Sequence, residues 1–326
     1  MSAATAPPKV FVTGANGFIG RALVERFREL GSEVSGVDLR PGDDGVVVQG
    51  DVTAPGDWQR QARGCDVVVH TAALVGMYSS PRGFWESNVL APRLALDAAI
   101  EGGAQRFVHL SSIVVFGFDF EGEVDERTPV RPNGVHYVDT KIASERVVLA
   151  AHAEDEIPCT IVRPGDVYGP RSRPWTIEPV RLLRSGQAAL PSGGRGLHSP
   201  VYVDDLVAGV LQAATVPEAA GGTFTVTGAE AVTIADFMGH YCRMLGIDPP
   251  RTLPAGVARS AARVIDAVAR LRRAPNEVTP AGIDYLMRRG TYSIAHARAV
   301  LGYEPAVDLD EGMRRTEAWL RSAGLI

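Results

Sequence analysis

A glycine-rich turn near the N-terminus limits the possible folds more than any other feature of this sequence. The apolar run Lys9–Thr13 leads directly into Gly14, Gly17 and Gly20, and a helical pattern continues from there to residue 30. In such a strand–turn–helix unit the glycines permit a tight turn, close approach of the backbone to a phosphate, and close packing of helix on strand. The N-terminus of the helix also offers unpaired N–H groups and a partial positive charge. The turn therefore predicts a βαβ unit with a dinucleotide site.

The first half of the chain alternates short valine-rich strands with helical patterns. Further strands are expected at 33–38, 46–49, 66–71, 106–110 and 159–162, with helices at 56–63, 84–101 and 138–154. This alternation predicts an α/β fold: a doubly wound parallel sheet covered on both faces. Later helices are expected at 203–214, 234–245 and 255–273, mainly in a smaller C-terminal substrate lobe. We expect the dinucleotide-binding domain at 1–165, with a return near 200–230, and the lobe at 166–326.

Asp38 ends the second expected strand, 18 residues after Gly20. A carboxylate at this place can accept hydrogen bonds from the adenosine ribose and repels a 2′-phosphate, which favours NAD over NADP. Arg40 follows two residues later and is an alternative partner for a 2′-phosphate. We interpret Arg40 as a solvated loop charge, because Asp38 occupies the strand end. NAD is the predicted cofactor.

Two more strand ends carry residues that suit a bound dinucleotide. Asp51 and Val52 follow the third strand, and Thr71, Ala72 and Ala73 follow the fourth. A carboxylate at position 51 can reach an adenine amino group, although it can equally cap a helix N-terminus. Small residues after the fourth strand let the backbone pass close to the cofactor. The order of these segments favours the binding interpretation.

Tyr137 and Lys141 stand four residues apart, on one face of an expected helix. A cation close to a phenol stabilises the phenolate, so the tyrosine can exchange a proton with an alcohol or ketone. A tyrosine and a lysine at this spacing often occur by chance. Ser112, earlier in the chain, favours the catalytic interpretation of the pair. Ser112 follows the fifth strand, at the sheet edge where these folds place ligands. A serine there can bind the substrate oxygen, or merely cap the next helix.

Taken in order, these motifs resemble the extended short-chain dehydrogenase/reductase family, which includes NAD-dependent epimerases and dehydratases. The matching segments are TGANGFIG at 13–20, Asp38, Gly50–Val52, HTAA at 70–73, Asn88, Ser111-Ser112, Val115–Gly117, Tyr137-x-x-x-Lys141, Arg163–Pro170, Val201–Asp205 and Leu301–Pro305. They cover nearly the whole chain. The resemblance implies a Rossmann-type fold, an NAD-dependent enzyme acting on CH–OH groups, and a homodimer.

The same resemblance assigns roles to individual residues. Ser112, Tyr137 and Lys141 would carry catalysis, and Asn88 would be a structural or relay residue. The expected cofactor-binding residues are Gly14, Asn16, Gly17, Phe18, Ile19, Gly20, Asp38, Arg40, Asp51, Val52, Thr71, Ala72, Ala73, Asn88, Tyr137, Lys141, Pro164, Gly165 and Val167.

One position separates this chain from the nucleotide-sugar enzymes of the family. Those enzymes usually carry an arginine just before the V-Y-V-D-D segment, where it meets a diphosphate, and His198 stands at the matching position here. Loss of a bidentate phosphate clamp argues against a nucleotide-sugar substrate. Apolar residues in the pocket-side loops favour a lipophilic alcohol or ketone. The C-terminal motifs resemble the 3β-hydroxysteroid dehydrogenase-like branch. The expected substrate-binding residues are Val75, Met77, Trp85, Val114, Trp175 and His198.

Two other functions are alternatives for a sequence with these motifs. A nucleotide-sugar epimerase that retains NAD would use the same three catalytic residues, with Arg195 or Arg171 replacing the missing clamp. A non-catalytic sensor that binds a dinucleotide and a protein partner is disfavoured, because it has no need of a proton-transfer set.

Composition excludes several classes of partner. The net charge of −5 provides no basic field for nucleic acid. Three widely spaced cysteines and seven histidines show neither a disulfide framework nor metal-ligand spacing. Without a secretory signal or a membrane-spanning apolar run, we expect a cytoplasmic protein with no stable membrane insertion. Residues 255–273 predict a surface helix, with a membrane-surface or lid helix as the alternative.

Overall fold

The computed structural model describes residues 6–42, 45–76, 81–272, 276 and 278–326. Its centre is a seven-stranded sheet in the order β12-β7-β5-β4-β1-β2-β3, and every neighbouring pair is parallel. The strands are β1 (Lys9–Thr13), β2 (Glu33–Asp38), β3 (Val47–Gln49), β4 (Val67–His70), β5 (Arg106–Leu110), β7 (Cys159–Pro164) and β12 (Thr223–Val226). The predicted doubly wound parallel sheet is confirmed.

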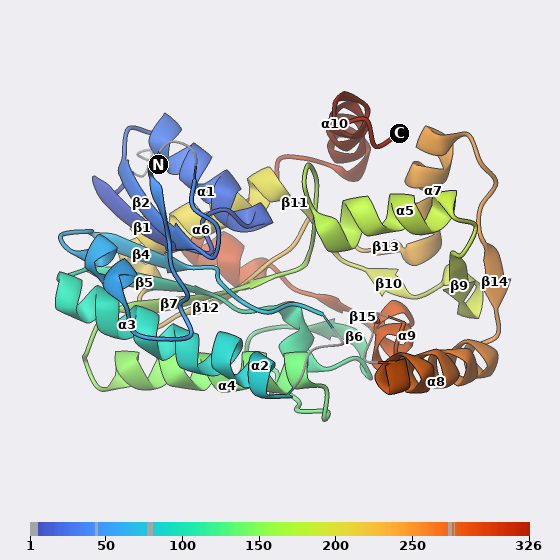
Figure 1. The fold of residues 1–326 in the computed structure, drawn as a ribbon, viewed down its shortest axis with the longest axis horizontal. Coiled ribbons are helices and arrows are strands. Elements are labelled where there is room, and N and C mark those ends of the chain that lie inside the picture. The colour runs from blue at the N-terminus through green and yellow to red at the C-terminus, as the bar shows by residue number, and fades with distance from the viewer. Residues whose placement is uncertain (1–5, 43–44, 77–80, 273–275, 277) are drawn as a thin grey trace.

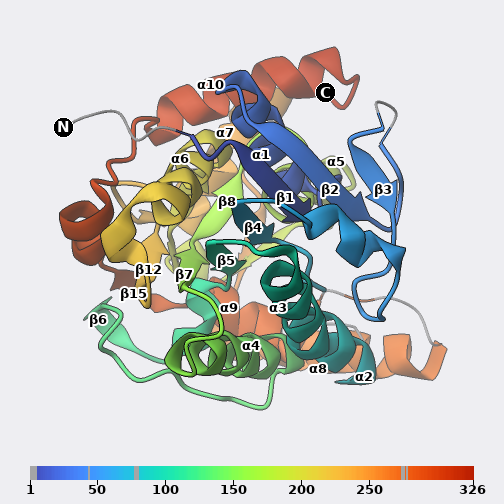
Figure 2. The ribbon, with the colours of Figure 1, turned by 90° about the vertical axis from the view of Figure 1, so that its left-hand side faces the viewer.

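Helices cover both faces of this sheet (Figure 2). One face carries α1 (Phe18–Glu29) and α6 (Val203–Thr215), and the other carries α3 (Ala91–Gly102) and α4 (His136–Ala153). Because both faces are covered, the central strands are mostly apolar, as in the fully buried β4, where three valines precede a histidine. The hydrophobic core accordingly has two layers, one on each side of the sheet.

The segment expected as one helix at 84–101 is divided in three. It consists of α2 (Pro81–Trp85), a π-helical turn at Glu86–Leu90, and α3. Pro92 lies in the first turn of α3 and has no N–H with which to continue the regular helical ladder. The wider π-helical turn before Pro92 accommodates this missing backbone hydrogen bond, and single π-turns of this kind commonly interrupt α-helices. The segment expected as a helix at 56–63 is a 3₁₀ helix at Asp57–Ala62.

The remaining elements form a second lobe beside the carboxyl ends of the strands (Figure 1). Its helices are α5 (Glu178–Arg184), α7 (Ile234–Leu245), α8 (Ala255–Arg272) and α9 (Pro280–Leu286), while α10 (Leu309–Ser322) closes the chain. Small two-stranded pairs are β6 (Glu121–Val124) with β15 (Arg289–Tyr292), β8 (Asp166–Tyr168) with β11 (Pro200–Tyr202), β9 (Ala189–Pro191) with β14 (Arg251–Leu253), and β10 (Leu197–His198) with β13 (Val232–Thr233). None of the helices in the described residues is long and apolar enough to cross a bilayer.

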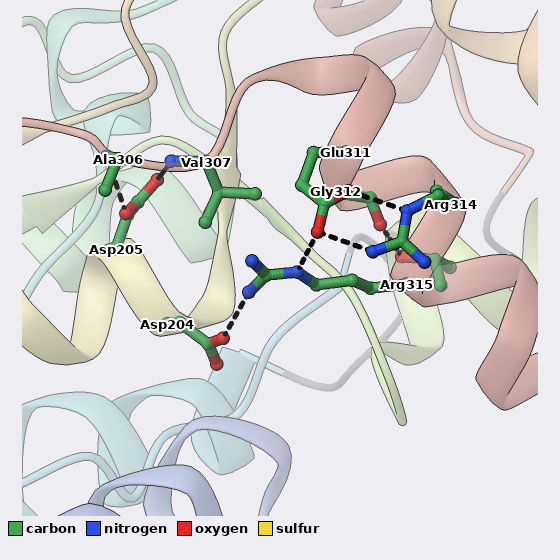
Figure 3. Close-up of polar contacts among 9 residues, drawn as sticks. Asp204, Asp205, Ala306, Val307, Glu311, Gly312, Arg314 and Arg315 are labelled. Carbon is green, nitrogen blue, oxygen red and sulfur yellow. Dashed lines mark hydrogen bonds and ion pairs between the residues drawn. The ribbon is translucent and has the colours of Figure 1, made fainter.

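Two carboxylates at the start of α6 hold the C-terminal segment (Figure 3). Asp205 accepts the backbone N–H groups of Ala306 and Val307 at 2.9 and 3.1 Å. Asp204 pairs with Arg315 of α10 at 3.3 Å. The V-Y-V-D-D motif thus joins α10 and the segment before it to the start of α6.

A buried ion pair connects α4 to two strands of the sheet. Arg163 of β7 donates from Nε and Nη2 to the two carboxylate oxygens of Glu145 on α4, at 2.8 and 2.7 Å. Ser111, directly after β5, donates to the same carboxylate at 2.6 Å. Both charged residues are at most 5 % exposed. Such a pair fixes geometry through directional bonds that no apolar contact would replace.

We predict that Glu145→Ala lowers the free energy of unfolding by about 3–5 kcal/mol, because it leaves the guanidinium of Arg163 buried without its counter-ion. Glu317→Ala is the matched control, since its pair with Arg321 is exposed, and it should cost less than about 1 kcal/mol. Urea denaturation followed by circular dichroism measures both. Equal losses in the two variants would contradict a special role for the buried pair.

Candidate active site

A cavity of about 1580 Å³ lies at the carboxyl ends of the strands, between the sheet and the second lobe. Pockets for one drug-sized ligand are typically about 300–1000 Å³, so this cavity has room for a dinucleotide and a substrate together. Most residues singled out from the sequence line it. They are Gly14, Gly17, Phe18, Ile19, Gly20, Asp38, Asp51, Val52, Thr71, Ala72, Ala73, Val75, Ser112, Val114, Tyr137, Lys141, Pro164, Gly165, Val167 and Trp175.

The glycine turn has the shape that a pyrophosphate requires. Gly14 has φ +67°, and a Cβ there would lie 2.9 Å from the backbone of Ala72. A Cβ on Gly20 would lie 2.1 Å from the carbonyl oxygen of Gly14, so helix and strand pack too closely for any side chain. Helix α1 begins after Gly17 without a side-chain cap. Its first N–H groups are therefore available to an anion in the cavity, which fits the phosphates of NAD.

Asp38 is held in place by the backbone around it. Its carboxylate accepts the N–H of Asn16 at 3.1 Å and that of Arg40 at 3.2 Å. The side chain of Asn16 donates to the carbonyl of Arg40 at 2.7 Å. Asp38 lines the cavity, whereas Asn16 and Arg40 do not. Asn16 and Arg40 hold the Asp38 carboxylate, and the expectation that they contact the cofactor stays a prediction.

Asn88 is also placed differently from the expectation of a cofactor contact. It is buried and outside the cavity lining. Leu74 N–H donates to its side-chain oxygen at 2.8 Å, and its nitrogen donates to the Leu74 carbonyl at 3.0 Å and to Thr140 at 3.1 Å. Asn88 therefore fixes the loop after β4 against α4, which fits the structural alternative.

Two other expected substrate contacts remain. Trp85 is 51% exposed on α2 and outside the cavity lining. Met77 lies outside the described residues.

The three candidate catalytic residues meet at the inner end of the cavity. Tyr137 and Lys141 lie one turn apart near the start of α4. Lys141 is buried and donates from Nζ to the carbonyl of Leu110, the last residue of β5, at 2.8 Å. Ser112, two residues later, lies close enough to the Tyr137 side chain to lower the pKa of its phenol. The end of β5 thus contacts both the lysine and the tyrosine.

Burial changes the acidity of both titratable groups. It raises the pKa of Tyr137 to about 12, with Ser112 acting in the opposite direction. It lowers the pKa of Lys141 to about 8, with Glu145 opposing. At neutral pH the lysine is charged and the phenol holds its proton. Further positive charge near the phenol would make that proton easier to release.

A buried cluster next to the cavity was not anticipated from the sequence. Asp166 accepts the backbone N–H of Ser199 at 2.9 Å and pairs with Arg288 Nη2 at 2.5 Å and His198 Nδ1 at 3.0 Å. Tyr285 donates its hydroxyl to the other carboxylate oxygen. Asp166 and Tyr285 line the cavity, while His198 and Arg288 lie behind them. The expectation that His198 contacts substrate is therefore wrong.

The cluster is neutral as a whole. Although burial opposes the charged form, Arg288 and His198 hold the pKa of Asp166 well below its usual range. Burial lowers the pKa of His198, so its imidazole is uncharged at neutral pH. Arg288 is 1 % exposed, and its guanidinium also stacks on the Tyr285 ring at 3.8 Å. A buried arginine committed in this way offers no charge to a ligand in the cavity.

The arginines considered as replacements for the missing clamp are placed apart. Arg195 lines a separate cavity of about 900 Å³, beside Arg131 and Arg289, and does not reach the active-site cavity. Arg171 lines the active-site cavity, with Glu25 at 3.9 Å from its guanidinium. Of the two, only Arg171 remains available to a ligand there.

The pKa of Lys141 predicts a measurable pH dependence of stability. The unfolded chain, with a lysine pKa of 10.5, binds more protons than the folded chain between about pH 8 and 10.5, so this group makes unfolding costlier as pH rises through that window. Relative to Lys141→Met, the wild type should gain about 2 kcal/mol between pH 7 and 10. Denaturation at both pH values, without cofactor, measures the difference. Parallel pH profiles of the two proteins would contradict the lowered pKa.

Comparison with known proteins agrees with this geometry. The chain is 26% identical to the human (Homo sapiens) sterol-4-alpha-carboxylate 3-dehydrogenase, decarboxylating, over 94% of this chain and 86% of the relative. It is 29% identical to a dTDP-glucose 4,6-dehydratase of Streptomyces antibioticus, over 96% and 92% of the two chains. Among solved structures, MoeE5 in complex with UDP-glucuronic acid and NAD superimposes with a TM-score of 0.79 at 26% identity, covering 97% of this chain and 99% of that one.

A separate match shows the family to which the chain belongs. Residues 10–227, more than half of the chain, match the NAD dependent epimerase/dehydratase family. The match runs from β1 through the glycine turn and the Tyr137–Lys141 helix to the end of β12. The resemblance inferred from the motifs is thereby confirmed, and this chain is a member of the NAD dependent epimerase/dehydratase family.

Proposed function

We propose that this protein is an NAD-dependent dehydrogenase or reductase that transfers hydride between nicotinamide and a lipophilic secondary alcohol or ketone, with a 3β-hydroxysteroid as a candidate substrate. The glycine turn would hold the pyrophosphate and Asp38 the adenosine ribose. Bound NAD would supply the hydride acceptor and a positive ring charge. The observation that carries the choice of a lipophilic substrate is the inward pairing of Arg288 with Asp166.

In the proposed mechanism each of the three inner residues has a separate task. Ser112 orients the substrate oxygen, and Tyr137 takes the hydroxyl proton during oxidation or returns it during reduction. Lys141, charged at neutral pH, would stabilise the phenolate that forms when Tyr137 gives up its proton. The hydrogen bond from Lys141 to the Leu110 carbonyl holds the ammonium close to the end of β5.

The walls of the cavity support a lipophilic substrate. Trp175 stacks on Tyr285 with ring centroids 6.0 Å apart, and both line the cavity. The part of the cavity wall that the second lobe provides is mostly apolar. The apolar residues there are Leu253, Ala258, Ala261, Ala262, Ile265, Val278, Ile283 and Leu286. A nucleotide diphosphate would meet the neutral Asp166 cluster where the nucleotide-sugar enzymes carry a cation. An apolar molecule would meet surfaces that gain free energy by losing contact with water.

A nucleotide-sugar epimerase or dehydratase that retains NAD is the second candidate. Arg171, Arg173 and Arg251 line the cavity and favour this alternative. However, Arg171 and Arg173 each have an acidic neighbour, Glu25 at 3.9 Å and Glu178 at 3.3 Å. These partners reduce the charge that the two arginines offer to a phosphate.

A screen for NADH formation at slightly alkaline pH separates the two functions. The protein is given NAD with 3β-hydroxysteroids, with other lipophilic secondary alcohols, and with UDP-sugars. NADH formed with a sterol or another lipophilic alcohol supports the proposal. Interconversion of a UDP-sugar without net NADH would assign the protein to the epimerases. It would also show that the pairing of Arg288 with Asp166 does not prevent binding of a nucleotide sugar.

We predict that Tyr137→Phe lowers turnover by at least about 100-fold, because no other group replaces the proton transfer. NADH affinity, measured by fluorescence titration, should change little. Tyr292→Phe is the matched control, because this buried tyrosine packs on Phe116 outside the cavity lining and its hydroxyl makes no hydrogen bond within the described residues. Substantial turnover in Tyr137→Phe, or an equal loss in Tyr292→Phe, would contradict the assignment.

A further inference from the structure

Helix α8 carries a row of exposed apolar side chains on its outer surface. Val257, Val264, Val268 and Leu271 are 53%, 65%, 41% and 85% exposed. Their spacing of seven, four and three residues places them on one side of the helix, at about 3.6 residues per turn. Scattered exposed apolar side chains are common, whereas a continuous row of this kind marks a contact surface. We call these four residues the α8 stripe.

The α8 stripe is continuous with the wall of the active-site cavity. Ala258 and Ala262 are buried and line the cavity from α8. Ala261 and Ile265 line it too, and Ile265 is 45% exposed. By helical spacing, these last two residues lie between the stripe and the buried alanines. An unbroken apolar surface therefore runs from the outside of the molecule to the cavity.

The charge of α8 is opposite in sign to that of the protein. The helix contains four arginines and a single acidic residue, Asp266, in a chain whose net charge is −5. Arg270 pairs with Asp266 at 2.8 Å, but within the described part of the chain Arg263 and Arg272 have no ion-pair partner. Exposed apolar side chains beside unpaired arginines match a surface that is apolar beneath a layer of negative charge.

A second exposed apolar rim lies on the same side of the molecule. Helix α2 runs along the same lower edge as α8 in both ribbon views (Figures 1 and 2). It carries Trp85, which is 51% exposed, and tryptophan is enriched where proteins meet the membrane–water interface. Val75, 52% exposed, lines the cavity from the loop before α2.

We propose that the α8 stripe docks on an anionic lipid surface, with Arg263 and Arg272 binding lipid headgroups, and that this contact places the mouth of the cavity against the membrane. The contact is interfacial, because the helix lies along the surface with one face in the lipid. The delivery of a lipophilic substrate through this mouth rests on the proposed function; the docking itself does not. Its test therefore requires neither turnover nor a known substrate.

The test is flotation of the full-length protein with vesicles of phosphatidylcholine and phosphatidylglycerol, compared with phosphatidylcholine alone. We expect binding to the anionic vesicles that falls with added salt, and little binding to the neutral ones. Leu271→Glu should weaken binding at least tenfold, because it puts a negative charge into the apolar contact. Arg263→Gln with Arg272→Gln should weaken it by about 10- to 30-fold.

Leu30→Glu is the matched control, since Leu30 is a 39% exposed leucine at the end of α1 in the sheet domain. It should bind anionic vesicles as the wild type does, and thermal unfolding should show that all variants are folded. Absence of wild-type flotation, or unchanged flotation of Leu271→Glu, would overturn the proposal. A change from dimer to monomer in Leu271→Glu, measured by light scattering, would also overturn it and identify the stripe as a contact between two copies. Because flotation needs no catalysis, an inactive protein in the NADH screen leaves this result standing.

Discussion

The buried pair between Glu145 and Arg163 is the interaction on which the geometry of the site depends. It fixes α4 against β7, and through Ser111 against the end of β5. Together with the hydrogen bond from Lys141 to the Leu110 carbonyl, this junction holds the tyrosine and lysine of α4 beside the serine that follows β5. Apolar packing alone would hold helix and sheet together, but it would tolerate sliding of the helix by a fraction of a turn. Hydrogen bonds between buried charged groups do not tolerate such sliding, because they weaken when their geometry changes. A fixed helix position matters here because a proton must pass between defined atoms.

A second buried pair lies beside the cavity. Asp166 binds Arg288 behind the cavity wall, so the guanidinium does not line the cavity. The carboxylate is in turn neutralised and shielded by the Tyr285 hydroxyl. Two buried charges that cancel leave a surface dominated by aromatic rings. In the proposed function, this cluster is the feature that favours a lipophilic substrate over a nucleotide sugar.

The parts that the sequence predicted are those encoded locally. The glycine turn, the valine-rich strands and the residues at strand ends depend on near neighbours and on the fixed polarity of a parallel sheet. The Asp166 cluster joins residues up to 122 positions apart, so no local sequence pattern predicts it. His198 was misjudged because its motif position suggested a ligand contact, whereas the fold buries it behind Asp166. Trp85 was expected in a loop at the pocket side, whereas it is the last residue of α2 and lies outside the cavity lining.

The attachment of the C-terminal segment has a consequence for how this chain can vary. Within the described residues, the hydrogen bonds to the Asp205 carboxylate come from the backbone N–H groups of residues 306 and 307, so they place no demand on the side chains there. Almost any residue satisfies it at these two positions, and proline alone removes the donor. The attachment thus depends on the carboxylate of Asp205, while the side chains of residues 306 and 307 can vary in sequence. An insertion or deletion between this segment and α7 would change the second lobe and leave the anchor intact.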